Sequence, residues 1–289
     1  MRRCPSCRAA IGAGPWRCTA CGWQAPVVDG VAVLAPQSEA AGTGFDPEQF
    51  AVLFDLDAGN FWFRARNELI AWALRRYFPD ARRMLELGCG TGFVAAGIES
   101  RFPDMQIVAS ELFSRGAALA RRRLRRAEVV QMDGRNVFFE SEFDVAGAFD
   151  VIEHVAEDEA VLGELHKSLR PGGGLLLTVP QHPWLWSALD AYSQHQRRYS
   201  RAELAAKLRR AGFRILRCTS FMSLLLPAML VSRRRMAAQP EKLDPMAEFR
   251  LSRTANAALG AVMDAERWLI QAGVSWPVGG SLLAVAQRI

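Results

Sequence analysis

Four cysteines near the start of the chain have a spacing that could hold a metal ion. Cys4 and Cys7 form one C-x-x-C pair, and Cys18 and Cys21 form a second. Two such pairs can direct four thiolates at one tetrahedral centre, as in structural zinc sites. Two disulfides are the alternative, but the basic start is not followed by the apolar run of a signal peptide, so we expect a cytoplasmic protein with reduced thiols. The sequence therefore predicts a small zinc ribbon over residues 1–36.

A glycine-rich turn in the middle of the chain could bring a ligand against the backbone. The segment Met84–Phe93 reads MLELGCGTGF, an apolar run followed by glycines at alternate positions. Glycines allow a tight turn and let a ligand approach main-chain N–H groups, and the helix expected beyond the turn adds a partial positive charge. A tight strand-to-helix loop that binds nothing is the alternative.

Acidic residues follow several of the predicted strands. Glu111, Asp133 and Asp150 each come directly after a stretch of strand length. Because the carboxyl ends of parallel strands meet at one edge of a sheet, these carboxylates should lie near the glycine turn. In nucleotide-binding α/β folds, an acid after the second strand accepts hydrogen bonds from ribose hydroxyls; a surface position is the alternative. The strands are expected at residues 84–87, 106–110, 128–132, 143–149 and 175–179.

Helical segments alternate with these strands and define the fold class. The segment 61–77 places Phe63 and Ile70 on one apolar face. Arg64 and Arg66 are expected on a solvated face, with contact to an anionic group as the alternative. The alternation predicts an α/β fold, with a mostly parallel sheet covered by helices on both faces. Further helices are expected at residues 93–99, 114–126 and 157–169, and a lead-in helix from residue 46 within a segment 37–60 whose small polar stretch, 38–44, is a linker.

Histidines lie after the fourth and fifth predicted strands, where proton transfer or metal binding could occur. His154 follows Glu153, His182 lies just past the fifth strand, and His195 follows later in the same loop. That loop, residues 181–199, also holds two tryptophans and two arginines, and we expect it to form a lid. A structural or surface role is the alternative for each single histidine.

Together these motifs resemble those of the class I S-adenosylmethionine-dependent methyltransferases, over about residues 61–289. LELGCGTGF is similar to their first motif, and LRPGGGLLLTVP to their fifth-strand motif. The resemblance implies a Rossmann-like, seven-stranded sheet that ends in a reversed hairpin at 213–219 and 281–287, with a helical insert at 221–280. It also implies S-adenosylmethionine as cofactor. The cofactor-binding residues that it implies are Glu86, Gly88, Cys89, Gly90, Gly92, Glu111, Leu112, Asp133, Gly134 and Asp150.

A narrower resemblance, to the ubiquinone-biosynthesis-type O-methyltransferases, concerns the residues after the fourth strand. Those enzymes carry an acid and then an E-H pair there, and in some relatives this set holds a divalent metal together with a later histidine. Asp150, Glu153, His154 and His195 could form such a second metal site here, with Asp at the position where the pattern has Glu. His154, His195 and His182 are the candidate bases, needed only where the acceptor must lose a proton.

The composition leaves the partner open. The chain of 289 residues carries a net charge of +6, and almost all of its basic residues are arginines. Half of all residues are hydrophobic. This charge permits RNA or an anionic membrane surface as partner and requires neither. The favoured function is methylation of an oxygen or nitrogen atom on a small molecule, a sugar, or a lipid- or carrier-linked intermediate. No oligomeric state is indicated.

An RNA-modifying enzyme is the main competing hypothesis. A four-cysteine ribbon joined to this fold also resembles the large-subunit rRNA guanine-N1 methyltransferases, and Arg2, Arg3, Arg8 and Arg17 make the ribbon basic. Against this, the sequence lacks the interleaved aromatic and basic residues that stack bases. The ribbon could also dock to a protein. Residues 221–235 are an apolar stretch followed by arginines and could contact a membrane surface. The apolar part is too short to span a bilayer.

Overall fold

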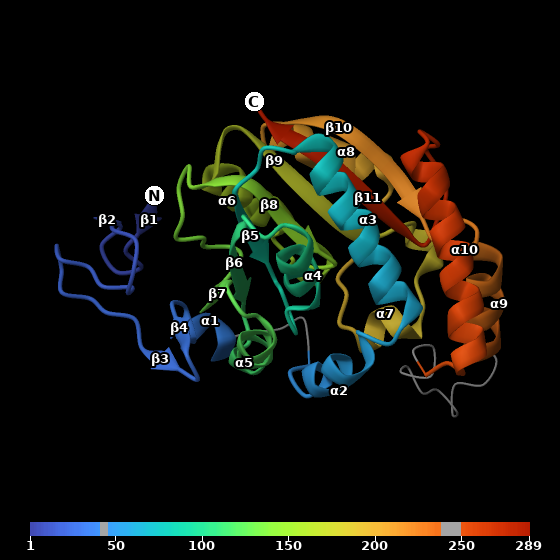
Figure 1. Cartoon of the computed structure of the whole chain (residues 1–289), viewed down its shortest axis with the longest axis horizontal. Coiled ribbons are helices and arrows are strands. Elements are labelled where there is room, and N and C mark those ends of the chain that lie inside the picture. Colours follow the sequence, from blue (N-terminus) through green and yellow to red (C-terminus); the bar gives the residue numbers. More distant parts are fainter. Residues whose placement is uncertain (41–45, 238–249) are drawn as a thin grey trace.

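A nine-stranded sheet organises the part of the chain that the structure describes, residues 1–40, 46–237 and 250–289 of a computed structural model. The strand order is β10-β11-β9-β8-β5-β6-β7-β4-β3 (Figure 1). Strands β1 (Arg2–Arg3) and β2 (Ala10–Ile11) pair separately in the N-terminal ribbon. The sheet strands are β3 (Val27–Val28), β4 (Val31–Val33), β5 (Arg83–Leu87), β6 (Gln106–Glu111), β7 (Glu128–Gln131), β8 (Phe143–Phe149), β9 (Leu169–Pro180), β10 (Phe213–Phe221) and β11 (Ser281–Arg288).

The central strands are parallel and buried on both faces. β5 lies between β6 and β8, and all neighbouring pairs from β7 through β5 to β9 are parallel. Strands covered on both faces are near-continuous apolar runs, which is why Met84, Leu85 and Leu87 are almost completely buried. β11 then runs antiparallel between β9 and β10, as the reversed hairpin predicts.

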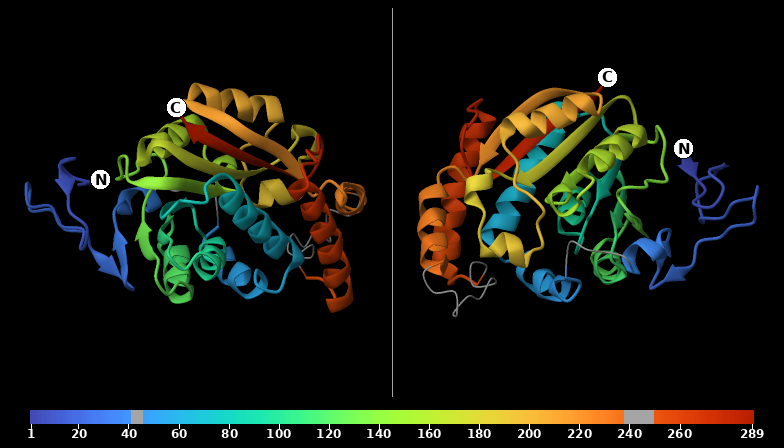
Figure 2. Two further views of the ribbon diagram at one scale, coloured as in Figure 1. Left: turned by 45° about the horizontal axis from the view of Figure 1, so that its top comes forward. Right: turned by 180° about the vertical axis from the view of Figure 1, so that it is seen from behind.

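Helices cover both faces of the sheet, and their buried side chains form two separate cores. Helices α3, α4, α5 and α10 pack on one face, and α6 and α8 on the other (Figure 2). None of the helices in the described ranges is long and apolar enough to cross a membrane. The helices are α1 (Pro36–Ala40), α2 (Gln49–Leu56), α3 (Phe61–Tyr77), α4 (Phe93–Arg101), α5 (Ser114–Arg123), α6 (Asp158–Ser168), α7 (Ala188–Tyr192), α8 (Arg201–Arg210), α9 (Leu226–Ala237) and α10 (Arg253–Gln271), with short 3₁₀ turns η1 (Ile152–His154) and η2 (Pro183–Leu185).

The expectation of seven strands is wrong, because the N-terminal segment adds two strands to the sheet. β4 pairs parallel with β7, with Ala32 opposite Val130, and β3 pairs antiparallel with β4. In a seven-stranded sheet β7 would be an edge with unpaired N–H and C=O groups, and β4 covers that edge. Val31 and Val33 are buried there and Ala32 is half-buried. Strand β4 thus packs its two valines into the protein while its backbone pairs with β7.

Three smaller differences concern segment boundaries. Helix α1 occupies the start of the linker predicted at 38–44, and residues 41–44 of that linker lie outside the described part. The lead-in helix begins at Gln49 rather than at residue 46. β9 begins at Leu169, well before the predicted residue 175, because it pairs with β8 across an irregular stretch between Leu169 and Gly174. Of the helical insert, α9 and α10 are described, and residues 238–249 lie outside the described part.

Candidate active site

A cavity of about 570 Å³ opens at the carboxyl ends of β5, β6, β7 and β8. Its walls come from the glycine turn after β5, the turns after the next strands, the N-terminal half of α3, and the loop that carries α7. This volume is in the range of small-molecule sites, and the position is the one at which open parallel sheets bind ligands.

The glycine turn has the conformation that its sequence requires. Gly88, Gly90 and Gly92 have φ values of 67°, 54° and 76°, in the left-handed region that favours glycine. A Cβ atom at Gly88 would lie 2.6 Å from a methyl group of Val151, so no larger residue fits there. Gly92 serves as the N-cap of α4 and packs against Ala120 rather than lining the cavity.

Glu111, at the end of β6, is fixed by backbone donors from both sides. Its Oε2 accepts a hydrogen bond from the Gly90 N–H at 2.8 Å, and its Oε1 accepts one from the Phe113 N–H at 3.1 Å. Burial raises the pKa of this carboxyl, and the backbone donors only partly offset the rise. Glu111, the acid predicted after the second strand, thus lies directly against the glycine turn, where its carboxylate could accept hydrogen bonds from a ribose.

Glu86 brings a second buried carboxyl to the floor of the cavity. Its side chain is 2% exposed, and its Oε2 has no hydrogen-bond partner among the described residues. Burial raises the pKa of Glu86 to about 8, although the Arg66 guanidinium pulls it back. A buried carboxyl oxygen without a partner is costly, so this oxygen is available to a polar or cationic group of a ligand.

Asp133, after β7, is turned toward a neighbouring arginine. Its carboxylate accepts hydrogen bonds from Arg135, the shortest of the guanidinium ones at 2.8 Å. Burial acts to raise the pKa of Asp133, but the hydrogen bonds from Arg135 outweigh it and leave the pKa below its usual value. Asp133 is therefore an ionised acceptor at the rim of the cavity.

Asp150, after β8, is held in an ion pair. Its Oδ2 accepts from Arg66 of α3 and, at 3.0 Å, from the Thr178 hydroxyl of β9. The Arg66 guanidinium also lies over the Trp62 ring, 4.4 Å from its centre. These contacts engage the carboxylate of Asp150, which does not belong to the group of possible ligand atoms that Glu153, His154 and His195 form among the described residues.

Glu153, His154 and His195 come together at the centre of the cavity. One ligand atom from each lies within 4.8 Å of the others. The two imidazole rings meet edge to face, with centroids 4.7 Å apart. Both oxygens of Glu153 are buried and have no hydrogen-bond partner in the part of the chain that the structure describes. Burial, together with the charge of Asp150, raises the pKa of Glu153 well above the usual range.

Asp190 orients His195 from the far side. Asp190 Oδ1 lies 2.9 Å from His195 Nδ1 and 2.7 Å from Arg198 Nε. Burial would raise the pKa of Asp190, but the hydrogen bond from His195 and the charge of Arg198 hold it well below its usual value. An ionised Asp190 makes Nδ1–H the favoured tautomer of His195, which leaves its Nε2 with a lone pair for a proton or a metal.

Most of the predicted site residues line this one cavity. Apart from the four ribbon cysteines, the exceptions are Gly92 and His182. The ring of His182 instead stacks on Trp184, with centroids 5.0 Å apart. The predicted residues that do line the cavity are Glu86, Gly88, Cys89, Gly90, Glu111, Leu112, Asp133, Gly134, Asp150, Glu153, His154 and His195.

Sequence reasoning missed several charged residues of the cavity. Arg66 was expected on a solvated face, but it is 8% exposed and points inward. Its position three residues after Phe63 and four before Ile70, on the apolar face of α3, was the signal that could have placed it. The loop residues Asp190 and Arg198 gave no such periodic signal. Arg233 of α9 also lines the cavity.

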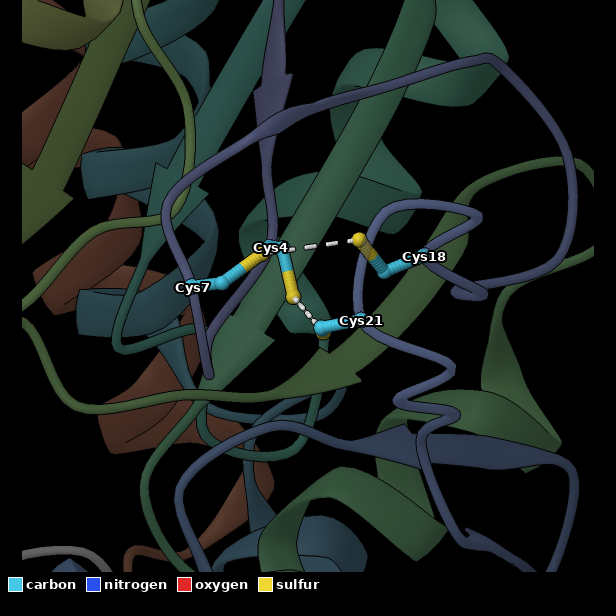
Figure 3. Close-up of side chains that lie close together, drawn as sticks. All are labelled: Cys4, Cys7, Cys18 and Cys21. Carbon is cyan, nitrogen blue, oxygen red and sulfur yellow. Dashed lines mark hydrogen bonds between the residues drawn. The ribbon is translucent and has the colours of Figure 1, made fainter.

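The four N-terminal cysteines also lie together, away from the cavity (Figure 3). Cys4 Sγ is 3.8 Å from Cys21 Sγ, and Cys7 Sγ is 3.6 Å from Cys18 Sγ. Cys4 and Cys18 are buried, and Cys7 and Cys21 are exposed. All four are free thiols rather than disulfides.

Comparison with known proteins points to one family. The model of the methyltransferase domain family matches residues 57–217, more than half of the 289 residues. A probable S-adenosylmethionine-dependent methyltransferase of Mycobacterium tuberculosis is 31% identical over 164 residues, which cover 55% of this chain and 58% of the relative. Trans-aconitate 2-methyltransferase of Azoarcus sp. is 30% identical over 119 residues, which cover 41% of this chain and 46% of the relative. The chain thus matches about half the length of these curated relatives.

Solved structures share the fold. The complex between the Haloferax volcanii Trm112 methyltransferase activator and a methyltransferase includes a chain that aligns with a TM-score of 0.55 and 16% identity, covering 84% of this chain and 96% of the other. Geranyl diphosphate methyltransferase, solved with GPP and sinefungin, aligns with a TM-score of 0.54 and 15% identity, covering 78% of each chain. At these identities the likeness establishes the architecture alone.

Proposed function

This chain belongs to the methyltransferase domain family, and from that premise we propose that it is an S-adenosylmethionine-dependent enzyme that methylates an oxygen or nitrogen atom of a small organic or carrier-linked acceptor. The observation that carries the proposal is the juxtaposition of Glu153, His154 and the Asp190–His195 pair inside the cavity. A methyl transfer to O–H or N–H releases a proton, and this set of groups can receive it.

The cavity floor fits the cofactor. Gly88 leaves a space that a Cβ would fill, and Glu86 offers a buried oxygen without a partner, suited to the cationic amino-acid end. Glu111 and Asp133 offer ionisable oxygens at the ends of the next two strands, suited to ribose hydroxyls and an adenine amino group. When bound, the cofactor supplies an activated methyl group on a sulfonium. The protein's part is then to orient the acceptor and exclude water.

Apolar side chains in the cavity wall suit an acceptor with an apolar body. Trp62, Phe63, Met222 and Met229 line the cavity, and methionine side chains adapt readily to ligands of irregular shape. Arg233 adds a cation to the lining. These residues support an organic acceptor that carries an apolar portion.

His195 is the proposed base. Its Nδ1 faces the ionised Asp190, which fixes the ring and stabilises the imidazolium that forms when Nε2 takes the acceptor's proton. The edge-to-face contact with His154 places a second imidazole beside it.

A divalent cation is the second chemistry that these residues fit. Glu153, His154 and His195 would hold it, and Asp190 would orient His195 behind it, as carboxylates do for metal-bound histidines. The two partnerless oxygens of Glu153 support this assignment, whereas Asp150 is engaged by Arg66 and is not part of the proposed set. Such a cation would lower the pKa of an acceptor hydroxyl.

For the ribbon we propose a structural zinc ion held by Cys4, Cys7, Cys18 and Cys21. The sulfurs of a tetrahedral site with Zn–S bonds of about 2.3 Å lie about 3.8 Å apart. The sulfur separations of 3.6 Å and 3.8 Å agree with that edge. Four protein ligands leave no open position, so this ion would take no part in methyl transfer.

The charges of the ribbon argue against the RNA-modifying hypothesis. Arg2 pairs with Glu128, and Arg3 pairs with Glu140 of the main body. Arg8 donates a 2.6 Å hydrogen bond to Asn136 Oδ1. Three of the four arginines that made the ribbon basic thus face the protein itself, and Arg17 alone of the four is exposed in the described chain without such a contact.

An acceptor screen with methyl-labelled cofactor tests the proposed function. Candidate alcohols, carboxylic acids, amines, lipid-linked sugars and RNA are compared, each with Mn²⁺, Mg²⁺ or Zn²⁺ and with a chelator. Transfer to a small or carrier-linked O or N acceptor supports the proposal, and transfer to RNA alone overturns it. Because chelation would also strip the ribbon, zinc is restored to the ribbon first: transfer that then still requires Mg²⁺ or Mn²⁺ would assign the cluster as a metal site, whereas transfer without either supports His195 as base.

A further inference from the structure

We propose that the N-terminal ribbon controls the affinity of the cofactor pocket, and that the buried side chain of Gln131 is the positioning residue that couples the two. Metal loading of the four cysteines would then set cofactor binding. The inference rests on the proposed function, since it takes S-adenosylmethionine as the ligand of the cavity.

Gln131 joins the segment that follows the ribbon to the turn that carries the ribose acid. Its side chain is completely buried. Its Oε1 accepts from the Ala35 N–H at 2.9 Å, and its Nε2 donates to the Ala35 carbonyl at 3.0 Å. The same Nε2 donates to the Leu112 carbonyl at 2.8 Å. One amide group therefore bridges Ala35 and the residue directly after Glu111.

The segment beyond Ala35 reaches the same turn a second time. Glu39 of α1 accepts from the Ser114 N–H at 2.8 Å and from the Ser114 hydroxyl at 2.5 Å, at the first residue of α5. Phe113, the residue before it, donates its own N–H to Glu111. The position of Glu111 is thus fixed from residues 35 and 39 as well as from the glycine turn.

The ribbon itself supports the loop that carries Asp133. Arg8 donates to Asn136, and its guanidinium lies over the Phe138 ring, 5.0 Å from the centre. The Arg3 N–H donates to the Phe138 carbonyl at 2.8 Å. Asn136 in turn donates its N–H to the Asp133 carbonyl at 3.0 Å. A displaced Arg8 would therefore loosen the loop at the adenine end of the pocket.

The turn that contains Cys4 and Cys7 fixes the position of Arg8. Arg8 follows Cys7 directly and has a φ of 62°, a conformation that a non-glycine residue adopts only when its surroundings impose it. Its N–H donates to the Cys4 carbonyl at 3.0 Å, and the Cys4 N–H donates to the Ala9 carbonyl at 2.8 Å. A metal bound by Cys4 and Cys7 would lock this turn, and its removal would release Arg8.

Calorimetric titration of S-adenosylmethionine into the full chain tests the proposal. We expect the zinc-loaded protein to bind at least about 10-fold more tightly than the chelated protein. Arg8→Ala and Gln131→Met, with zinc still bound, should each weaken binding by about 3- to 10-fold, since each removes buried or charge-assisted hydrogen bonds behind the pocket. Arg17→Ala and Gln106→Met are the matched controls. Arg17 is exposed like Arg8 but makes no hydrogen bond to the Asp133 loop among the described residues, and Gln106 is an exposed glutamine.

Four outcomes decide the matter. Equal affinity of the loaded and chelated proteins, or unchanged affinity in both Arg8→Ala and Gln131→Met, overturns the coupling. If chelation unfolds the chain, as circular dichroism would show, the two point variants decide alone. Faster amide hydrogen exchange of residues 111–114 and 133–136 in the variants supports the proposal through a readout independent of the ligand. If the loaded wild type fails to bind the cofactor at all, both this inference and the proposed function fail.

Discussion

Glu86 and Glu153 are buried carboxyl groups whose surroundings oppose ionisation, and they show what the cavity is built to receive. Each has a side-chain oxygen that accepts no hydrogen bond from residues 1–40, 46–237 or 250–289, although both lie in the interior. Such groups persist where a ligand or ion compensates them. Glu86 lies beside the glycine turn and Glu153 beside the histidines, so under the proposed function Glu86 would face the cofactor and Glu153 the reacting atoms.

Glu86 gives the unliganded protein a pH-dependent stability. Its folded pKa of about 8 lies above the unfolded value of 4.5, so the native state binds more protons between these values, and the free energy of unfolding falls as pH rises from about 4.5 to 8. Glu86→Gln should abolish this contribution and stabilise the protein at pH 8 by about 1–3 kcal/mol. Urea unfolding at pH 5 and pH 8 measures it. Equal pH dependence in both proteins would contradict the assignment.

His195 and Asp190 should act as a unit. We expect His195→Gln and Asp190→Asn each to lower turnover by about 100-fold, the usual contribution of a positioned base. Cofactor affinity should change by less than about 3-fold, because neither residue lies at the glycine turn. A double variant no slower than either single one would support the pair; multiplicative losses would argue for independent roles.

At the scale of elements, helix α2, which precedes strand β5, packs against the glycine turn. α2 ends at Asp57, which is 1% exposed and ties three elements together. It accepts from the Thr91 hydroxyl at 2.8 Å, within the glycine turn, and from Arg123 of α5 at 2.6 Å. Phe50 of α2 would meet a Cβ built on Gly90 or Gly116. Helix α2 is therefore the cover of the turn and not a free lead-in.

The cost of breaking this junction should be large. Asp57→Ala leaves Arg123 without its buried partner, and we expect a loss of about 3 kcal/mol of unfolding free energy. Asp55→Ala, which changes an exposed side chain of the same helix, should alter it by less than about 0.5 kcal/mol. Thermal or urea denaturation compares the two. Similar stability of both variants would mean that α2 does not hold the turn.

For the molecule as a whole, the sequence predicted the parts that obey simple periodicity. The parallel strands and α3 lie where their apolar patterns placed them, and acids at strand ends met at one edge because topology requires it. What it missed depends on contacts distant in sequence. Nothing local in Val31–Val33 says that these residues pair with β7, and nothing in the lid loop says that Asp190 faces His195. The buried Arg66 is the exception, since helical spacing contained the signal.

The ribbon and the main body should unfold as one unit. Cys4, Ile11 and Trp16 belong to the same buried cluster as α6 and the sheet, so a boundary at residue 36 does not separate two cores. Trp16 is 4% exposed, meets the Phe139 ring edge to face at 5.4 Å, and donates its indole N–H to Glu128 at 2.9 Å.

Trp16→Ala should therefore destabilise the whole chain by about 3–5 kcal/mol and lower a single cooperative transition. Phe139→Ala should cost a similar amount, and the double variant should fall short of the sum by about 0.5–1.5 kcal/mol, because both changes remove the same contact. Calorimetry with zinc present distinguishes this from an independent ribbon. Two separate transitions, with the main one unchanged in temperature by Trp16→Ala, would show that the ribbon unfolds independently of the main body. The proposed coupling between the ribbon and the cofactor pocket would then lack its structural support.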